Sequence, residues 1–146
     1  MYKRTITLFN RFNNSWYPTI INNVDFNADK AAIIGRYGAQ SQDRATLHIR
    51  YSKSGDDIEI ARKTWLPPKE YRAQESVNDT LTFTDGNENF DFIYVGEWES
   101  EEVISDDAYG IDGFYNYMNK HYDGVFSISS VSSPFVLIPH FEIVVR

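Results

Sequence analysis

The chain has 146 residues, 42% of them apolar and 24% charged, and it contains no cysteine. This composition excludes a disulfide framework, a thiol nucleophile and thiolate metal sites, and it argues against a disordered chain. The formal net charge of −7 argues against sequence-specific binding of nucleic acid, which requires a concentrated basic patch.

The length fits one domain over residues 1–146, and the aromatic content of 16% favours β-structure. In TITLFNRF, residues 5–12, alternation puts Ile6 and Leu8 on one strand face and Thr7 and Phe9 on the other. Residues 17–26 continue as an extended run. Asn22 and Asn23 predict a bulge or turn within it, and Pro18 indicates a strand start or an edge.

Further strands follow along the chain. AAIIGRYG (31–38) and DRATLHIRYS (43–52) predict a strand pair joined through GAQSQD. Alternation on both sides of Asp85-Gly86-Asn87 predicts a hairpin over residues 81–95. GVFSISSVSS, a turn at Pro134 and HFEIVVR predict a last pair. About eight short strands with turns between them predict a mainly β fold, a small antiparallel β-barrel or sandwich.

Two segments interrupt the strands. WLPPKEYRAQESVND places Pro68 at the first position of a short helical turn. Residues 105–124 form the second segment, where Asp106 or Asp107 is placed to cap a short helix and two glycines oppose a long one. We expect one or two short helices and a long acidic-aromatic insertion over residues 97–119, and so long a loop is usually functional.

Charge is divided unevenly along the chain. Residues 1–72 hold twelve Lys or Arg against seven Asp or Glu, whereas residues 73–119 hold twelve Asp or Glu and no Lys or Arg. Residues 120–146 are balanced. This division predicts two oppositely charged surfaces on one domain.

The acidic segment has three readings: a solvated edge, a surface that meets a partner, or a metal site. Its carboxylates do not match the calcium-loop pattern, and a strand would put Glu97, Glu99 and Glu101 on one face, where they repel. We favour the first two readings and expect no metal and no cofactor. The residues expected to form an acidic contact or channel surface are Glu97, Glu99, Glu101, Glu102, Asp106 and Asp107.

No catalytic arrangement is visible. His48, His121 and His140 are scattered, no G-x-S-x-G elbow is present, and no glycine-rich phosphate loop occurs. A glycosidase-type carboxylate pair stays open, because its spacing is spatial. We expect no enzyme and no catalytic residue.

The aromatic residues allow two interpretations. Trp16, Trp65 and Trp98, with neighbouring tyrosines, fill the core or an interface, or they form a stacking platform of the carbohydrate-binding kind. We assign the three tryptophans to packing. The residues expected to form an adaptable contact loop are Tyr109, Phe114, Tyr115 and Tyr117.

Three stretches resemble a known group of proteins. They are ITLFNRFNNSWYPTIINNVDF, ATLHIRYS, and GVFSISSVSSP followed by HFEIVVR. In this order they resemble small proteins encoded in the morphogenesis region of tailed phages and prophages of Gram-positive bacteria. The chain departs from that pattern at Gly96-Glu97, where the family usually has Gly-Asp, and by the insertion over 97–119.

The resemblance implies a virion structural protein assembled in the bacterial cytoplasm. Its role would be head completion (a stopper), head–tail joining or a minor capsid position, as a small β-barrel that forms rings. The implied partners are other copies of the chain, portal or adaptor proteins and tail or capsid proteins, with passing contact to packaged DNA. A ring needs complementary faces, so the expected basic counterparts of the acidic surface are Arg36, Arg44, Arg50 and Arg62. The alternative is a β-sandwich carbohydrate-binding module.

Overall fold

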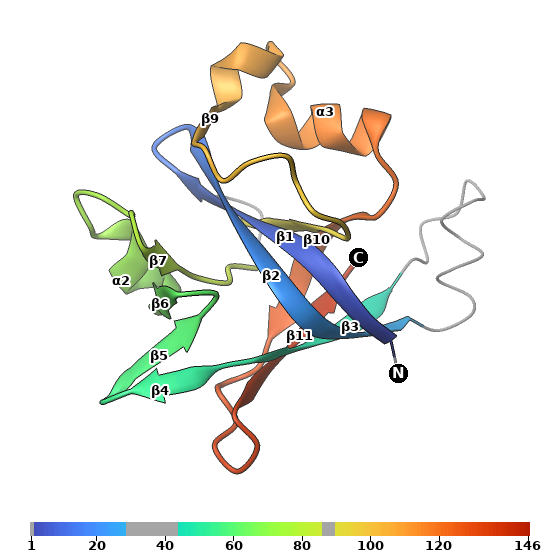
Figure 1. Cartoon of the computed structure of the whole chain (residues 1–146). Helices are drawn as coiled ribbons and strands as arrows, with labels where there is room; N and C mark the ends of the chain where they lie inside the picture. Colours follow the sequence, from blue (N-terminus) through green and yellow to red (C-terminus); the bar gives the residue numbers. More distant parts are fainter. Residues whose placement is uncertain (1, 29–43, 86–89) are drawn as a thin grey trace.

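The computed structural model describes residues 2–28, 44–85 and 90–146. It is mainly β and contains a closed antiparallel barrel of six strands (Figure 1). The strands follow one another around the barrel as β1 (Tyr2–Phe12), β8 (Phe92–Tyr94), β10 (Val125–Val131), β11 (His140–Val145), β3 (Ala45–Arg50) and β2 (Ser15–Ala28). The barrel closes because β2 also pairs with β1. The predicted fold class is confirmed.

Alternation along the strands selects the residues that fill the barrel. On β3, Leu47 and Ile49 point inward and are buried, whereas His48 between them lies half-buried on the outside. On β11, Phe141 and Ile143 are fully buried in the same core. This is the two-residue period expected of a sheet with one face in the core.

Strand β1 is buried on both faces. Ile6 and Leu8 face the barrel interior with no exposed area. Phe9 faces outward, and it is also fully buried because Trp98 and Phe114 cover it. The expected alternation is present, but a second layer hides its outer side.

The break expected at Asn22-Asn23 is confirmed. The pairing of β1 with β2 shifts register between Arg4 and Ile6, opposite these two asparagines. Asn23 has a φ of 57°, which fits a bulge. The edge expected at Pro18 is also confirmed. Pro18 lies opposite Phe9, and among the described residues no strand pairs with that part of β2 on its other side.

A second, smaller sheet packs beside the barrel. Its strands are β4 (Ser52–Ser54), β5 (Asp57–Ile60), β6 (Lys63–Trp65) and β7 (Thr80–Leu81), and the short helix α2 (Pro68–Arg72) joins β6 to β7. Pro68 opens α2, as predicted. Ile60 and Leu81 are buried in the core cluster of the barrel, so the two sheets share one core.

The hairpin predicted over residues 81–95 is wrong. Leu81 belongs to β7, which runs parallel to β6, whereas Phe92 belongs to β8, which pairs with β1 and β10. A single backbone hydrogen bond, from Asp91 N to Thr84 O at 3.3 Å, joins the two stretches among the described residues. Alternation identifies the buried face of a strand but not its partner. The AAIIGRYG strand expected at 31–38 lies outside the described residues.

The insertion after β8 forms a cap over one side of the barrel. It holds β9 (Ile104–Ser105), the 3₁₀ helix η1 (Asp106–Tyr109) and α3 (Gly113–His121), which lies above the barrel in Figure 1. Ser105, not Asp106 or Asp107, holds the cap position of η1, so the expected capping aspartate is wrong, and Asp106 is the first residue of the helix. Residues 97–103 are irregular rather than a strand, so their glutamates do not share one strand face.

Strands β10 and β11 form the predicted last pair, and their connection projects from the barrel. The turn over residues 136–139 stands away from the other elements at the lower end of Figure 1. Its base is anchored, because the Tyr51 hydroxyl donates to Phe135 O at 2.6 Å and Tyr51 N donates to Pro139 O at 3.2 Å.

Candidate interaction surfaces

The barrel interior is packed with side chains. Several core side chains among the described residues have no exposed area, including Leu8, Leu47, Ile93, Phe141 and Ile143. Phe141 contacts the rings of Trp65 and Phe83 at 4.9 and 5.2 Å between centroids. A close-packed core of this kind binds no small ligand, so the outer surfaces are the candidates for function.

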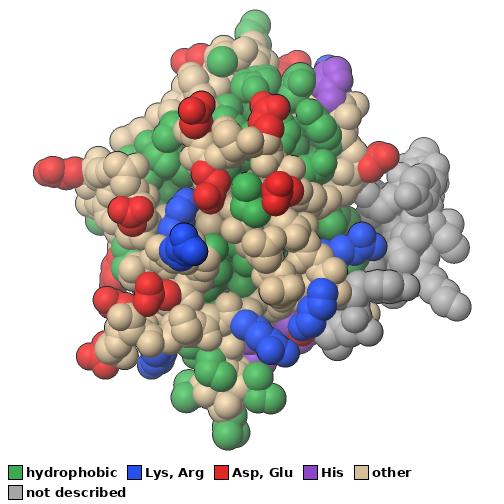
Figure 2. Space-filling view, viewed as in Figure 1, with side chains coloured by type: hydrophobic (Ala, Val, Ile, Leu, Met, Phe, Trp, Pro, Cys, Tyr) green, Lys and Arg blue, Asp and Glu red, His purple; other side chains and the backbone are tan. Residues whose placement is uncertain are grey.

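The acidic residues gather at the cap end of the molecule. Figure 2 shows Asp and Glu side chains over the upper part and the left side of one face, with Lys and Arg lower down. The exposed members of the expected acidic surface are Glu97, Glu99, Glu101, Glu102 and Asp107. Glu101 and Glu102 are adjacent in the chain. Among the described residues, Glu101 is the member of this set that forms an ion pair, with its carboxylate 3.8 Å from Lys63 Nζ.

Asp106 is a structural residue rather than a member of this surface. Its Oδ1 accepts hydrogen bonds from Trp16 Nε1 at 2.8 Å and from Phe114 N at 3.0 Å. Arg11 lies 4.0 Å from the other oxygen. The carboxylate thereby ties β1, β2 and α3 together, and it is turned inward by these donors.

The expected aromatic contact loop is largely part of the core. Phe114 is fully buried, with its ring centroid 5.2 Å from that of Phe9 and 5.7 Å from that of Trp98. Tyr109, Tyr115 and Tyr117 are half-buried and pack against the same cluster. The reason is that α3 turns its aromatic side onto β1 and β8 instead of standing free.

The tryptophans do not form a stacking platform. Trp16 is fully buried and Trp98 is 8% exposed, so both fill the core beneath the cap. Trp65 is half-buried against the barrel core. The assignment of these residues to packing is confirmed, and none of the three rings is free to stack on a sugar.

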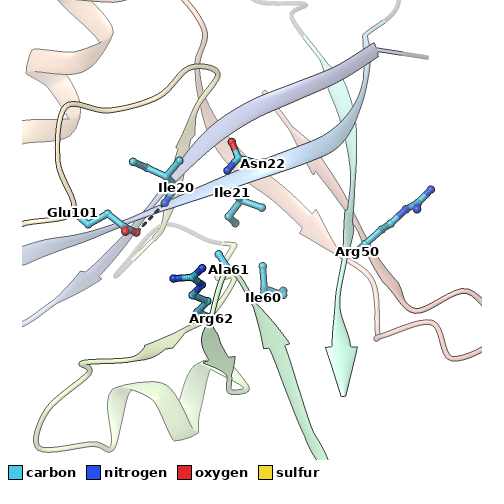
Figure 3. A pocket seen from close by; sticks show the side chains of 8 residues that line it. All are labelled: Ile20, Ile21, Asn22, Arg50, Ile60, Ala61, Arg62 and Glu101. Atoms are coloured by element: carbon cyan, nitrogen blue, oxygen red, sulfur yellow. Dashed lines mark hydrogen bonds between the residues drawn. The ribbon is translucent and has the colours of Figure 1, made fainter. Parts of the chain in front are cut away.

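Two of the expected basic residues line a groove between the barrel and the small sheet (Figure 3). Arg62 and Glu101 stand at one side of it, and Arg50 extends away from the other side. Arg44 is exposed at the start of β3, and Arg36 lies outside the described residues. The groove therefore brings an expected basic residue next to an expected acidic one within a single chain.

The groove has a mixed polar and apolar lining. Ile20, Ile21, Ile60 and Ala61 line the groove, which has a volume of about 530 Å³. Ile21 and Ile60 are almost fully buried in the core cluster, so Ile20 and Ala61 supply most of the accessible apolar surface. Lys63 fixes the spacing of the two sheets, because its Nζ donates to Thr19 Oγ1 at 2.7 Å and to Pro18 O at 3.2 Å. Burial lowers the pKa of Lys63, and Glu101 opposes that shift.

The β10–β11 turn holds a run of three consecutive, strongly exposed apolar residues. Val136 is 76% exposed, Leu137 is 100% exposed and Ile138 is 68% exposed. Figure 2 shows this apolar tip projecting at the lower end of the molecule. We call residues 135–138 the hairpin tip. Sequence reasoning missed it, although four apolar residues between two prolines in a turn are a signal for an exposed contact.

A buried ion pair lies where α2 meets the barrel. Arg72 Nη2 lies 3.1 Å from Asp91 Oδ1, which also accepts from Arg11 N at 2.9 Å. Burial raises the pKa of Asp91 to about 6, although Arg72 opposes the shift. This pair fastens α2 to the barrel, and it lies inside the fold rather than on a surface that a ligand reaches.

Comparison with protein families gives one match. The model of DUF6751, a family of unknown function, matches residues 1–145. The chain belongs to the DUF6751 family. No curated protein and no solved structure matches the chain. Within the described ranges, no helix has both the length and the apolar character needed to cross a membrane.

Proposed function

We propose that this member of DUF6751 is a structural assembly protein without catalytic activity, which forms a ring of identical subunits. The hairpin tip of one copy binds the groove of the next copy. The observation that carries the proposal is the exposure of Val136, Leu137 and Ile138 on an anchored turn. The likeness of three sequence stretches to phage morphogenesis proteins supports a place in a virion, as a head-completion or head–tail joining component.

Exposing the apolar side chains of the hairpin tip to water is unfavourable in free energy. Burying a Val, Leu or Ile side chain contributes about 1.5–3 kcal/mol each, so the three together supply roughly 5–9 kcal/mol before the costs of association. The turn is already held by Tyr51, so little order is lost when it binds. A rigid apolar projection is suited to insertion into a partner.

The groove is a suitable receptor on the second copy. It offers apolar surface from Ile20 and Ala61, with the charged side chains of Arg62 and Glu101 beside them. Apolar and charged side chains occur together in protein interfaces, so this lining can receive an apolar tip beside charged groups. The tip and the groove are different surfaces, so their contact is heterologous, and a heterologous contact with the right rotation closes into a ring.

The division of charge supports the same arrangement. Glu97, Glu99, Glu102 and Asp107 are exposed on the insertion, whereas Arg50 and Arg62 lie at the groove, where Glu101 is the one carboxylate of the acidic set. Copies arranged head to tail can then bring opposite charges together, which raises the rate of association and fixes orientation. Such assembly weakens at high salt if charge contributes to it.

Site-specific photo-cross-linking tests the proposed contact. A photoreactive phenylalanine analogue at position 137 should cross-link to the groove of another copy, at peptides that contain Ile20 or Ala61. The same analogue at Ile111, which is 105% exposed on the cap, serves as the matched control and should give no such product. Cross-links from position 137 that avoid the groove, or equal products from both positions, would refute the contact.

A further inference from the structure

The pairing of β3 with β11 brings two histidines and a glutamate together on the outside of the barrel. Glu142 lies directly opposite His48, and His140 lies two residues before Glu142 on the same face of β11. Their neighbours Ile49, Phe141 and Ile143 point into the core. The three polar side chains are half-buried, and the atoms they offer all lie within 4.8 Å of one another.

We propose that His48, His140 and Glu142 bind a divalent transition-metal ion, with Zn²⁺ as the best fit. Two imidazoles and one carboxylate form a common zinc ligand set, and a water molecule completes four-fold coordination. Ligand atoms on tetrahedral zinc are about 3.3–3.4 Å apart, so small side-chain rotations bring these three atoms into place. Imidazole and carboxylate together favour zinc over magnesium or calcium.

The ring of His140 is already oriented for this role. Its Nδ1 lies 2.6 Å from the carbonyl oxygen of Ile138. A carbonyl oxygen only accepts, so Nδ1 carries the proton and Nε2 keeps the lone pair that binds metal. The ring also stacks on Phe135, with centroids 4.7 Å apart and planes at 9°. A backbone acceptor on one nitrogen and a fixed ring plane are the features that accompany histidine ligands in metal sites.

The neighbouring charges are mixed. Asp25 on β2 lies opposite His48 and forms an ion pair with Lys3. Arg50 lies opposite His140, but it is exposed and extends toward solvent. Asp25 is paired with Lys3, so the carboxylate of Glu142 is the negative charge available to share a metal ion with the two histidines.

The location suggests what the ion does. His140 begins β11 and pairs with Phe135 across the base of the hairpin tip. A zinc ion shared by His48 and His140 joins β3 to this base and fixes the tip relative to the barrel. A ligand that binds only the folded state also raises the apparent stability in proportion to the logarithm of its concentration. The proposal does not depend on ring assembly.

Titration of the metal-free full-length chain with Zn²⁺ tests the site. We expect one ion per chain by calorimetry, and a rise in Tm when zinc is added. Replacing zinc by Co²⁺ should give the strong visible absorption of a tetrahedral cobalt site. His48→Ala and His140→Ala should each weaken binding at least tenfold, and Glu142→Gln should also weaken it.

His121→Ala is the matched control, because His121 is exposed on α3 away from the three ligands. It should bind zinc as the wild type does. Circular dichroism of each metal-free variant shows whether it has lost its fold or only its binding of zinc. If a histidine-to-alanine variant does not fold, His48→Gln or His140→Gln replaces it. Absence of one-to-one binding by the folded wild type, or binding that survives both His48→Ala and His140→Ala, would overturn the proposal.

Discussion

The indole Nε1 of Trp16 donates a hydrogen bond of 2.8 Å to Oδ1 of Asp106, and this bond joins the cap to the barrel. Trp16 is fully buried on β2, while Asp106 begins the helix η1 of the cap. The same oxygen accepts from the backbone of Phe114 at 3.0 Å. One carboxylate therefore positions both helices of the cap over the aromatic cluster.

Replacing Asp106 with alanine should destabilise the chain by about 2–4 kcal/mol, because two donors lose a charged acceptor and one of them is on a buried indole. Asp107→Ala is the control, since Asp107 is exposed, and it should change the free energy of unfolding by less than about 0.5 kcal/mol. Urea unfolding monitored by tryptophan fluorescence measures both. Equal effects of the two substitutions would show that Asp106 does not hold the cap.

Two glycines of the cap allow the packing around Asp106 to be tested separately. Gly113 and Gly110 have nearly the same φ, +83° and +82°, but a Cβ at Gly113 would lie 2.9 Å from the Asp106 carboxylate and one at Gly110 meets nothing within 4 Å. Gly110→Ala should cost about 1–3 kcal/mol from backbone strain alone, because its φ of 82° and ψ of −166° lie in a region that essentially only glycine adopts. Gly113→Ala should cost at least about 1 kcal/mol more, because it also displaces the carboxylate.

The comparison of these two variants needs only their free energies of unfolding under the same conditions. An equal loss at both positions would mean that the Asp106 carboxylate moves away without penalty.

Asp91 should make stability depend on pH. Its pKa in the folded chain is raised to about 6 from 3.8, chiefly by burial, so the folded state holds this proton more tightly than the unfolded state. The stabilisation is fully present below about pH 4 and is lost as the pH rises through 6, to an extent on the order of 3 kcal/mol.

The difference in free energy of unfolding between wild type and Asp91→Asn isolates this effect, because asparagine does not titrate. From pH 4.5 to 7 the wild type should lose stability relative to the variant, and above pH 7 the difference should stay constant. The reverse trend would mean that the ion pair with Arg72, rather than burial, sets the pKa of Asp91.

Much of the fold follows from the sequence, because alternation reports which strand face is buried. The bulge at Asn22-Asn23, the helical turn at Pro68 and the last strand pair were all predictable from local patterns. The partner of a strand was not predictable. Leu81 and Phe92 flank a good turn sequence, yet they join different sheets because each completes a different edge.

The candidate surfaces were less predictable than the fold. Five of the six residues expected in the acidic surface are exposed, but no local signal separates Asp106 from them. Asp106 accepts a hydrogen bond from Trp16, and Phe114 packs on Phe9, so both make inward contacts that the sequence does not reveal. His48 and His140 are far apart in the chain, and only the register of β3 with β11 brings them together. Contacts of this kind depend on pairing that local patterns do not encode.

The ring proposal rests on the hairpin tip, and sedimentation velocity over a range of protein concentrations tests it most directly. The wild type should sediment as a monomer when dilute and as larger closed species when concentrated. Leu137→Asp should remain monomeric with an unchanged free energy of unfolding, because Leu137 is fully exposed, and Ile111→Asp should assemble as the wild type does. A wild type that stays monomeric at every concentration, or a Leu137→Asp variant that assembles equally well, would contradict the proposal.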